Sequence, residues 1–494
     1  MKPFLHVEAD RKNYHKFKNK NTVHRSSLIV PRFDQASSNI SFLNHFLLKR
    51  NNKDVTLKIT AINDAGIIID SLSFEINEPR VYSFNLDNLF SETSKINEYI
   101  IEFFSDKNLF IPFPAVMVNH IGSDFVNSVH SFNRVLNDIF EDDKVNQVHV
   151  YESSVDVLIN KEYDTFFNFA TGPFKLKENI EIFFEEDSKI KKKIPIEMER
   201  LNNKNIFLSD YYKNKDENKS ILKILQPKQK LFYGRLLAGK INKRTNAFSA
   251  NHSYYDNSTV KEYFNNQTSR RTYPYFKDCL NKVIMYPIMS PSELEIFIEI
   301  YNGDKIFKSD VKLIKSPSKN SISFDIDKLV KDSGFIDVSL FKVVAKSSSD
   351  KIPTRIAHQL IYGDKKSSSE LNSSIGTALI NESIYNPSSK TGVSWGQVLI
   401  NRSYKNKLGI CFSNNSGSED QVSIDFYGKS GLLKSIKQNL SPNKALIFDN
   451  KFFDELGTSN EFIWYIAKSK RFDLQAMSFH YHMASGNASG EHSF

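Results

Sequence analysis

Histidines recur in this sequence in a pattern that could hold a metal ion. A His-Ser-aromatic tripeptide occurs three times, as His130-Ser131-Phe132, His252-Ser253-Tyr254 and His492-Ser493-Phe494. In the first and last copies a further histidine, His120 or His482, precedes the tripeptide, with nine residues between the two histidines. If those nine residues form a loop between adjacent antiparallel strands, the two imidazoles lie close together at the strand ends. Two neutral imidazoles at one loop can bind zinc, copper or iron.

Other side chains could complete each pair as a metal site. His480 lies two positions before His482 and therefore on the same face of its strand. Near the first pair, His45 or Asp138 could supply a third ligand. A divalent ion held there would act as a Lewis acid or would activate water or oxygen. One interpretation is therefore a metal-dependent hydrolase or oxygenase, with these metal ligands: His120, His130, His480, His482 and His492.

The spacing of the tripeptides indicates an internal repeat. From His130 to His252 is 122 residues, and from His252 to His492 is 240, which is twice 120. This spacing predicts a degenerate fourth copy near position 372, where Asn372-Ser373-Ser374 stands. A phenylalanine that closes a strand-like run recurs at a similar interval, at Phe84, Phe207, Phe324 and Phe448.

A third landmark is an alternating apolar and polar run upstream of each phenylalanine, at 56–59, 179–182, 294–300 and 422–426. Three landmarks in one order at a period of about 120 residues predict duplicated modules. We therefore expect a basic N-terminal arm followed by four modules, with these ranges: 1–25 for the arm, then 26–140, 145–268, 272–383 and 390–494.

Within each module the alternation has a period of two residues, which is typical of antiparallel strands with one buried and one exposed face. Turn signals such as Asn302-Gly303-Asp304 separate the strands. The fold class predicted is mainly β, with four tandem duplicated antiparallel β-sandwich modules of about 110–120 residues. Short helical turns are expected at Leu86-Asp87-Asn88-Leu89 and Ile326-Asp327-Lys328-Leu329.

The histidines also have a purely structural interpretation. The inner modules carry Asn242 and Tyr362 in place of the first histidine, and the third carries Asn372 in place of the second. Imidazole, amide and phenol groups can all hydrogen-bond a loop. The tripeptide could thus start a strand, with its serine capping a turn and its ring in the core, or could dock one module on the next.

One apparent catalytic motif does not fit its context. Gly392-Val393-Ser394-Trp395-Gly396 matches the nucleophile elbow of serine hydrolases. That elbow requires a strand before the serine and a helix after it. Here a loop precedes the motif and a predicted strand, 397–400, follows it. The motif therefore predicts no serine hydrolase.

Composition narrows the class of protein further. The chain has 494 residues, of which 40% are hydrophobic and 25% charged, and this is typical of folded proteins. Much of the net charge of +9 lies in the arm, so the rest is too thinly spread for a specific nucleic-acid groove. Cys279 and Cys411 lie too far apart in the chain to form a disulfide framework or a cysteine zinc site.

The sequence also predicts where the protein resides. The start lacks the apolar core of a signal peptide, and the longest apolar run, Leu109 to Val118, is shorter than the roughly 18 residues of a membrane helix. We expect a soluble, cytoplasmic protein without a transmembrane segment, although leaderless export or incorporation into a particle would also fit.

Aromatic and basic residues could form a binding surface. Tyr254 and Tyr255 with Arg270 could stack on sugars or bases, although such rings also fill cores. The first hypothesis is a non-enzymatic binding or assembly protein that recognises a glycan or a protein partner through hairpin loops and inter-module grooves. It needs no cofactor. The alternative is the metal-dependent enzyme described above, with zinc, copper or iron.

Overall fold

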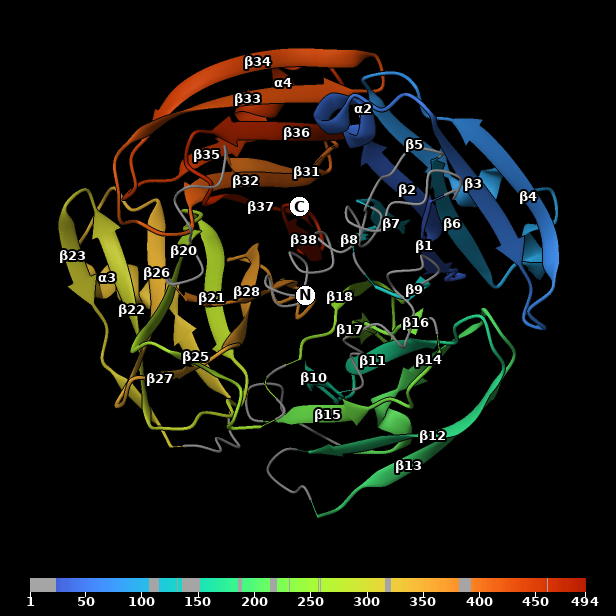
Figure 1. Ribbon diagram of the computed structural model, residues 1–494, viewed down its shortest axis with the longest axis horizontal. Coiled ribbons are helices and arrows are strands. Elements are labelled where there is room, and N and C mark those ends of the chain that lie inside the picture. The colour runs from blue at the N-terminus through green and yellow to red at the C-terminus, as the bar shows by residue number, and fades with distance from the viewer. Residues whose placement is uncertain are drawn as a thin grey trace.

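The regular elements of the chain are almost all antiparallel β-strands, as a computed structural model shows (Figure 1). Most of the chain is described, apart from short gaps and the first 23 residues. The described residues are 24–105, 115–130, 132–135, 152–184, 189–213, 220–230, 232–255, 257, 259–315, 321–381, 392–459 and 461–494. The predicted arm, residues 1–25, and Asp138 therefore fall almost wholly outside this part of the chain.

The strands form four β-sandwiches of eight main strands each. The first comprises β1 (His24–Pro31), β2 (Ser37–Leu43), β3 (Val55–Ile62), β4 (Ile68–Glu75), β5 (Val81–Asn85), β6 (Glu98–Ser105), β7 (Met117–Ile121) and β8 (Val126–Val129). The second comprises β10 (Glu152–Asp156), β11 (Tyr163–Ala170), β12 (Leu176–Phe184), β13 (Lys192–Met198), β14 (Asn203–Phe207), β15 (Ile221–Leu225), β17 (Leu237–Asn242) and β18 (Phe248–His252).

The other two sandwiches repeat this succession of strands. The third comprises β20 (Thr268–Pro274), β21 (Cys279–Met285), β22 (Leu294–Asn302), β23 (Lys305–Lys308), β25 (Ile322–Asp325), β26 (Leu340–Ser347), β28 (Ala357–Asp364) and β29 (Ser373–Ala378). The fourth comprises β31 (Gly392–Ile400), β32 (Tyr404–Phe412), β33 (Asp420–Gly428), β34 (Gly431–Leu440), β35 (Leu446–Asp449), β36 (Glu461–Ser469), β37 (Leu474–His482) and β38 (Ala488–His492).

Short elements complete the fold. The minor strands are β9 (Arg134–Val135), β16 (Phe232–Tyr233), β19 (Tyr263–Asn265), β24 (Lys312–Ile314), β27 (Lys351–Pro353) and β30 (Ile380–Asn381). The helices are α2 (His45–Arg50), α3 (Ile326–Ser333), α4 (Asn450–Asp454) and the 3-10 turns η1 (Leu86–Asn88), η2 (Thr93–Lys95) and η5 (Leu208–Asp210). In each sandwich a helix or helical turn, η1, η5, α3 or α4, follows the fifth main strand, and this confirms the two predicted helical turns.

All four sandwiches have the same strand order. The outer sheets run β1-β6-β3-β4, β10-β15-β12-β13, β20-β26-β22-β23 and β31-β36-β33-β34. The inner sheets run β5-β2-β7-β8, β14-β11-β17-β18, β25-β21-β28-β29 and β35-β32-β37-β38. The alternating landmarks fall on the third strand of each sandwich, and the four phenylalanines fall on the fifth. The period in the sequence therefore corresponds to the period of the strand order.

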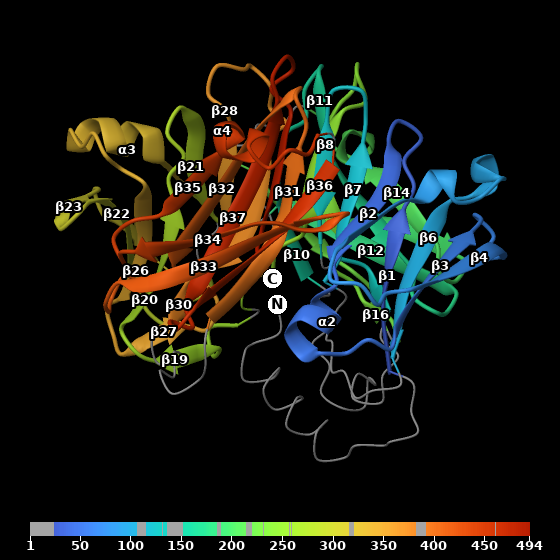
Figure 2. The ribbon, with the colours of Figure 1, turned by 90° about the horizontal axis from the view of Figure 1, so that it is seen from above.

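The sandwiches surround a central axis (Figure 1), and seen from above they lie at one level (Figure 2). The last strand of each inner sheet, β8, β18, β29 or β38, is an edge strand, and these four edges contact one another around the axis. Each edge strand pairs with its own sheet on one side only. Its other side is therefore free to contact the edge strands of the other sandwiches. The C-terminus lies in this centre (Figure 1).

Apolar packing also joins neighbouring sandwiches. The third and fourth sandwiches each have a core between their sheets, as does the outer part of the second. The core of the first sandwich continues into the second through Phe166 and Phe248 and into the fourth through Trp464 and Ile466. Strand β16 of the second sandwich also extends the outer sheet of the first through β9. The ring is therefore held by shared cores.

The start of the third sandwich differs from the sequence-based expectation. Strand β20 begins at Thr268, so the residues expected to link the second and third modules already pair with β26, and the third sandwich starts before residue 272. The other expected boundaries between modules lie in residues 136–151 and 382–391, outside the described part of the chain.

The elbow-like motif at 392–396 lies wholly within β31, which leaves no strand-to-helix turn to present Ser394. Among the described residues, no helix has the length and apolarity needed to cross a membrane.

The contact between Trp464 and Ser41 tests the closure of the ring. The buried indole Nε1 of Trp464 on β36 donates a hydrogen bond of 2.8 Å to Oγ of Ser41 on β2. We expect Trp464→Phe to lower the free energy of unfolding by about 2 kcal/mol. The substitution removes this bond and leaves the buried hydroxyl of Ser41 without its indole partner. Urea unfolding of Trp464→Phe, of Ser41→Ala and of the double variant measures the coupling. Strictly additive losses would contradict a bond between the sandwiches.

Candidate metal centre

At three of the four edge strands, a histidine at the axis is the last residue of the strand or follows it directly. His130 follows β8, His252 ends β18, and Glu491 and His492 end β38. Antiparallel pairing sets these positions, since His252 lies opposite Leu237 and His492 lies opposite Met477. A slip of one residue in either register would turn the imidazole to the other face of its sheet. Each ligand is therefore positioned by the hairpin of its own sandwich.

The four side chains meet around one point. Nδ1 of His130 lies 2.9 Å from Oε2 of Glu491. Nε2 of His492 and Nε2 of His252 lie 3.8 Å and 4.0 Å from Oε1 of Glu491. One nitrogen or oxygen atom from each of the four residues lies within 4.8 Å of the others. Four ligands of a tetrahedral zinc ion lie about 3.3 Å from one another, so small side-chain shifts would complete such a shell.

The imidazole rings are turned out of each other's planes, as ligands around one ion must be. The His130 ring stands at 87° to that of His492 and at 83° to that of His252, with ring centroids 4.6 Å and 5.4 Å apart. Nδ1 of His492 lies 2.8 Å from the carbonyl oxygen of Ser493. If Nδ1 donates its proton there, Nε2 carries the free lone pair and can bind a metal.

His252 gives the clearest sign of a missing ligand. Its ring is 2% exposed, and neither of its nitrogens has a hydrogen-bond partner among the described residues. Nδ1 of His130 and Oε2 of Glu491 are close enough for an ion pair, but they are not aligned as a hydrogen bond. Buried polar atoms without partners cost free energy. A metal ion at the centre would bind one nitrogen of His252 together with one ligand atom each from His130, His492 and Glu491, so the residues fit the group.

The electrostatics of the cluster set the protonation states of two imidazoles and of the carboxylate. Burial lowers the pKa of His252 well below its usual range, with Arg235 adding to the effect, and burial lowers the pKa of His492 to about 4. Burial alone would raise the pKa of the Glu491 carboxyl, but His130 and His492 beside it bring that pKa below its ordinary value. The centre thus holds neutral imidazoles at His252 and His492 together with an ionised carboxylate, which is the protonation state that metal binding requires.

The structure joins His130 and His492, but not through the predicted hairpins. The nine residues between His120 and His130 contain a turn, 122–125, and the whole of β8, and His120 lies opposite Asn127. His120 therefore lies beside the turn, roughly 10 Å along the strand from His130. His482 and His492 are separated in the same way by β38. The prediction of a metal site within each hairpin is wrong, because the edge strand carries the second histidine away from the turn beside which the first one lies.

The remaining predicted ligands have structural contacts of their own. His120 packs on Phe33 and Phe248, with Nε2 3.1 Å from the carbonyl oxygen of Pro31. Nε2 of His480 lies 2.8 Å from the carbonyl oxygen of Val126 and so links the fourth sandwich to the first. His482 holds its own turn through Ser485. Outside the predicted set, His45 packs on Phe46 and Trp395.

Among its described residues the third sandwich supplies no member of the cluster, and the predicted fourth tripeptide is displaced. His130, His252 and His492 each lie four residues after the first residue of their edge strand, and in β29 that position is Thr377. Asn372 precedes β29, because the loop from β28 is longer than in the other hairpins. Sequence reasoning also missed His252 and Glu491 as ligands. The recurrence of the tripeptide at one place in three modules was the available signal for His252.

The predicted binding residues do not form one surface. Tyr254 is buried, and its hydroxyl donates to the carbonyl oxygen of Ser374. The ring of Tyr255 lies 3.9 Å from the guanidinium of Arg355. Arg270 lies on β20 opposite Val344. Only Tyr254 of the predicted three lines the cavity described below.

Comparisons with known proteins do not show a family for this chain. No protein-family model and no curated protein matches the chain. Among solved structures, the chain has a slight likeness to dimeric latent PorU from Porphyromonas gingivalis, at 8% identity and a TM-score of 0.15. That likeness covers 88% of this chain and 40% of PorU, so the chain spans less than half the length of that protein. A likeness this slight carries no information about function.

Buried histidines outside the centre make stability depend on pH. Burial lowers the pKa of His45 and His358 to about 3, and that of His120 and His480 to about 4. The unfolded chain takes up these protons near pH 6.5, whereas the folded chain does not, so stability is full above that pH and falls as the pH drops towards 4.

At pH 5.5 each of these rings lowers the free energy of unfolding by about 1.4 kcal/mol. Urea unfolding in EDTA at pH 7.5, 6.5 and 5.5 measures this loss, and EDTA removes any contribution from metal. The variant His358→Gln should show a smaller loss over the same range. A free energy of unfolding that stays constant from pH 7.5 to 5.5 would contradict the neutral state of the buried rings.

Proposed function

We propose that the protein binds one divalent transition-metal ion at the axis through His130, His252, His492 and Glu491. The observation that carries this proposal is the buried imidazole of His252, which faces three other ligand groups with neither nitrogen hydrogen-bonded to a described residue. Zinc suits the site best, because zinc takes imidazole and carboxylate ligands in a four-coordinate tetrahedral shell. Copper(II) favours a tetragonal arrangement, and non-haem iron typically keeps open positions.

The proposed role of the ion is assembly rather than catalysis. Four protein ligands complete a tetrahedral shell, which is typical of structural zinc sites, whereas catalytic zinc keeps one position for water or substrate. The ligands come from the first, second and fourth sandwiches, so the ion would join three quarters of the ring at its centre. This is the assembly function expected from the sequence, with a metal added to it.

Related proposals follow from the same arrangement. We infer that the four sandwiches arose by duplication, because their strand order is the same. A site at the common axis explains why only some copies keep the histidine. We further propose that the ring is a scaffold that binds a glycan or a protein partner in the cytoplasm. The two cysteines are buried and free, which suits a reducing compartment.

Elemental analysis tests the metal centre. We expect about one zinc ion per chain in protein purified without chelator, and little or none in His252→Gln and Glu491→Gln, since each variant removes one of four ligands. His482→Gln is the matched control, because His482 ends β37 beside a turn and is not part of the cluster. EDTA should lower the melting temperature of the wild type and of the control, and zinc should restore it.

Two outcomes would contradict the proposal. One is wild-type protein that takes up no zinc, copper or iron when dialysed against them. The other is undiminished metal content in both His252→Gln and Glu491→Gln, provided that circular dichroism shows folded proteins.

A further inference from the structure

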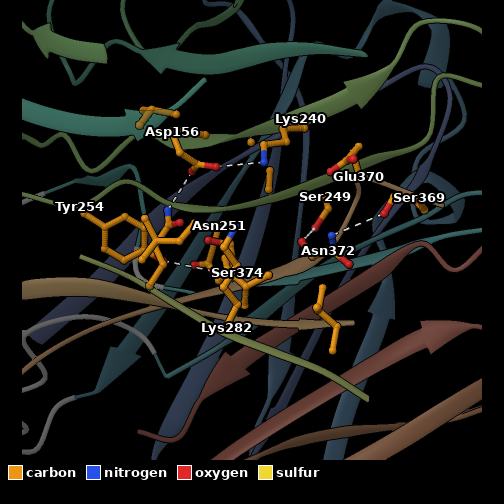
Figure 3. A pocket seen from close by; sticks show the side chains of 18 of the residues that line it. Asp156, Lys240, Ser249, Asn251, Tyr254, Lys282, Ser369, Glu370, Asn372 and Ser374 are labelled. Atoms are coloured by element: carbon orange, nitrogen blue, oxygen red, sulfur yellow. Dashed lines mark hydrogen bonds and ion pairs between the residues drawn. The ribbon is translucent and has the colours of Figure 1, made fainter. Parts of the chain in front are cut away.

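A second feature of the molecule is a cavity between the second and third sandwiches, which shares His252 with the metal centre proposed above. The cavity has a volume of about 290 Å³. Strands β10, β17 and β18 form one wall, and β21, β28, β29 and the loop before β29 form the other. Figure 3 shows side chains from both sandwiches around this space. Its size is at the lower end of the range for small-molecule sites.

The charges in the wall balance one another. Three lysines, Lys240, Lys282 and Lys365, and three acidic residues, Asp156, Asp364 and Glu370, line the cavity. Nζ of Lys240 lies 2.9 Å from Oδ2 of Asp156, and Nε2 of Gln359 donates a hydrogen bond of 3.1 Å to Oδ1 of the same carboxylate (Figure 3). An anion in this space would meet as many carboxylates as ammonium groups. The wall therefore suits a ligand without net charge.

Hydroxyl and amide groups make up much of the remaining lining. Ser249 Oγ donates to the carbonyl oxygens of Asn372 and Ala488, at 2.9 Å and 2.8 Å, so this part of the wall is held in place. Ser154 and Gln359 are 1% and 3% exposed, and Ser154 Oγ and Gln359 Oε1 have no hydrogen-bond partner among the described residues. Both atoms are buried within the wall, so the donors and acceptors that a ligand could reach come from less buried lining residues such as Lys282, Ser369 and Asn372.

The aromatic residues of the cavity support this wall rather than offering a stacking platform. Tyr254 and Tyr286 are 4% and 1% exposed, and their ring centroids lie 5.3 Å apart. A side-chain carbon added at Gly376 would fall 1.2 Å from the Tyr254 ring, so the ring fills the space over that glycine. Recognition in the cavity would therefore depend on hydrogen bonds to polar groups.

We propose that this cavity binds an uncharged, polyhydroxylated ligand of the size of a monosaccharide or a disaccharide. Many hydroxyl groups could pair with the serines, the amides and the balanced charges at once, and no net charge would be buried. The inference names a site and a ligand class for the proposed scaffold. It does not rest on the metal, although His252 also lines the cavity.

The test is saturation-transfer NMR on the full chain, with glucose, galactose, mannose, N-acetylglucosamine, maltose and lactose as probes. Glucuronate and inorganic phosphate are the charged comparators. We expect transfer to at least one uncharged sugar and none to the two anions. Transfer to the anions alone would overturn the ligand class, and transfer to no probe would overturn the site.

Variants then locate the binding. Lys282→Met removes a donor from the wall, and Ala238→Leu adds volume to it; each should weaken binding of the sugar that binds by about tenfold or more. The control Lys305→Met makes the same lysine-to-methionine change on the exposed strand β23. It should bind the sugar as tightly as the wild type does. Unchanged affinity in both cavity variants would overturn the proposal. Zinc content measured on each sample separates a failure here from a failure of the metal centre.

Discussion

One ionised carboxylate in a dry interior sets the main constraint on this molecule. Glu491 is 3% exposed and lies among three imidazoles, and the rings of His252 and His492 are kept neutral by burial. An isolated buried charge costs much free energy unless a counter-charge and hydrogen bonds compensate it. The neutral rings of His252 and His492 supply no counter-charge to this carboxylate. A divalent ion would supply a counter-charge and would also bind one nitrogen of His252, which has no hydrogen-bond partner among the described residues.

The ring of sandwiches exists because edges and faces need partners. Each inner sheet ends in an unpaired edge strand, and such edges are prone to pair with other chains. Here the four edges are covered by one another at the axis. The apolar faces between the first sandwich and its two neighbours are covered in the same way, by a core that includes Phe248 and Trp464. The metal centre lies where these constraints coincide, so its ligands are positioned by contacts between residues far apart in the sequence.

Local patterns predicted the sandwiches well and the site poorly. Alternation over 294–300 and the recurrence of phenylalanine placed the third and fifth strands of each module, because strand periodicity is a local property. The pairing of His120 with His130 failed because the four residues of β8 follow a short turn and place His130 at the far end of that strand. No sequence pattern marked Glu491 as a metal ligand, because its partners His130 and His252 come from other sandwiches. Such convergence depends on how the sandwiches pack, and spacing along one chain does not encode it.

Zinc K-edge X-ray absorption spectroscopy of the zinc-loaded wild-type protein tests the central claim most directly. The account predicts four nitrogen or oxygen neighbours at about 2.0–2.1 Å, with the outer-shell scattering of three imidazole rings. Sulfur scattering at about 2.3 Å, or a shell of oxygen neighbours without imidazole, would contradict it.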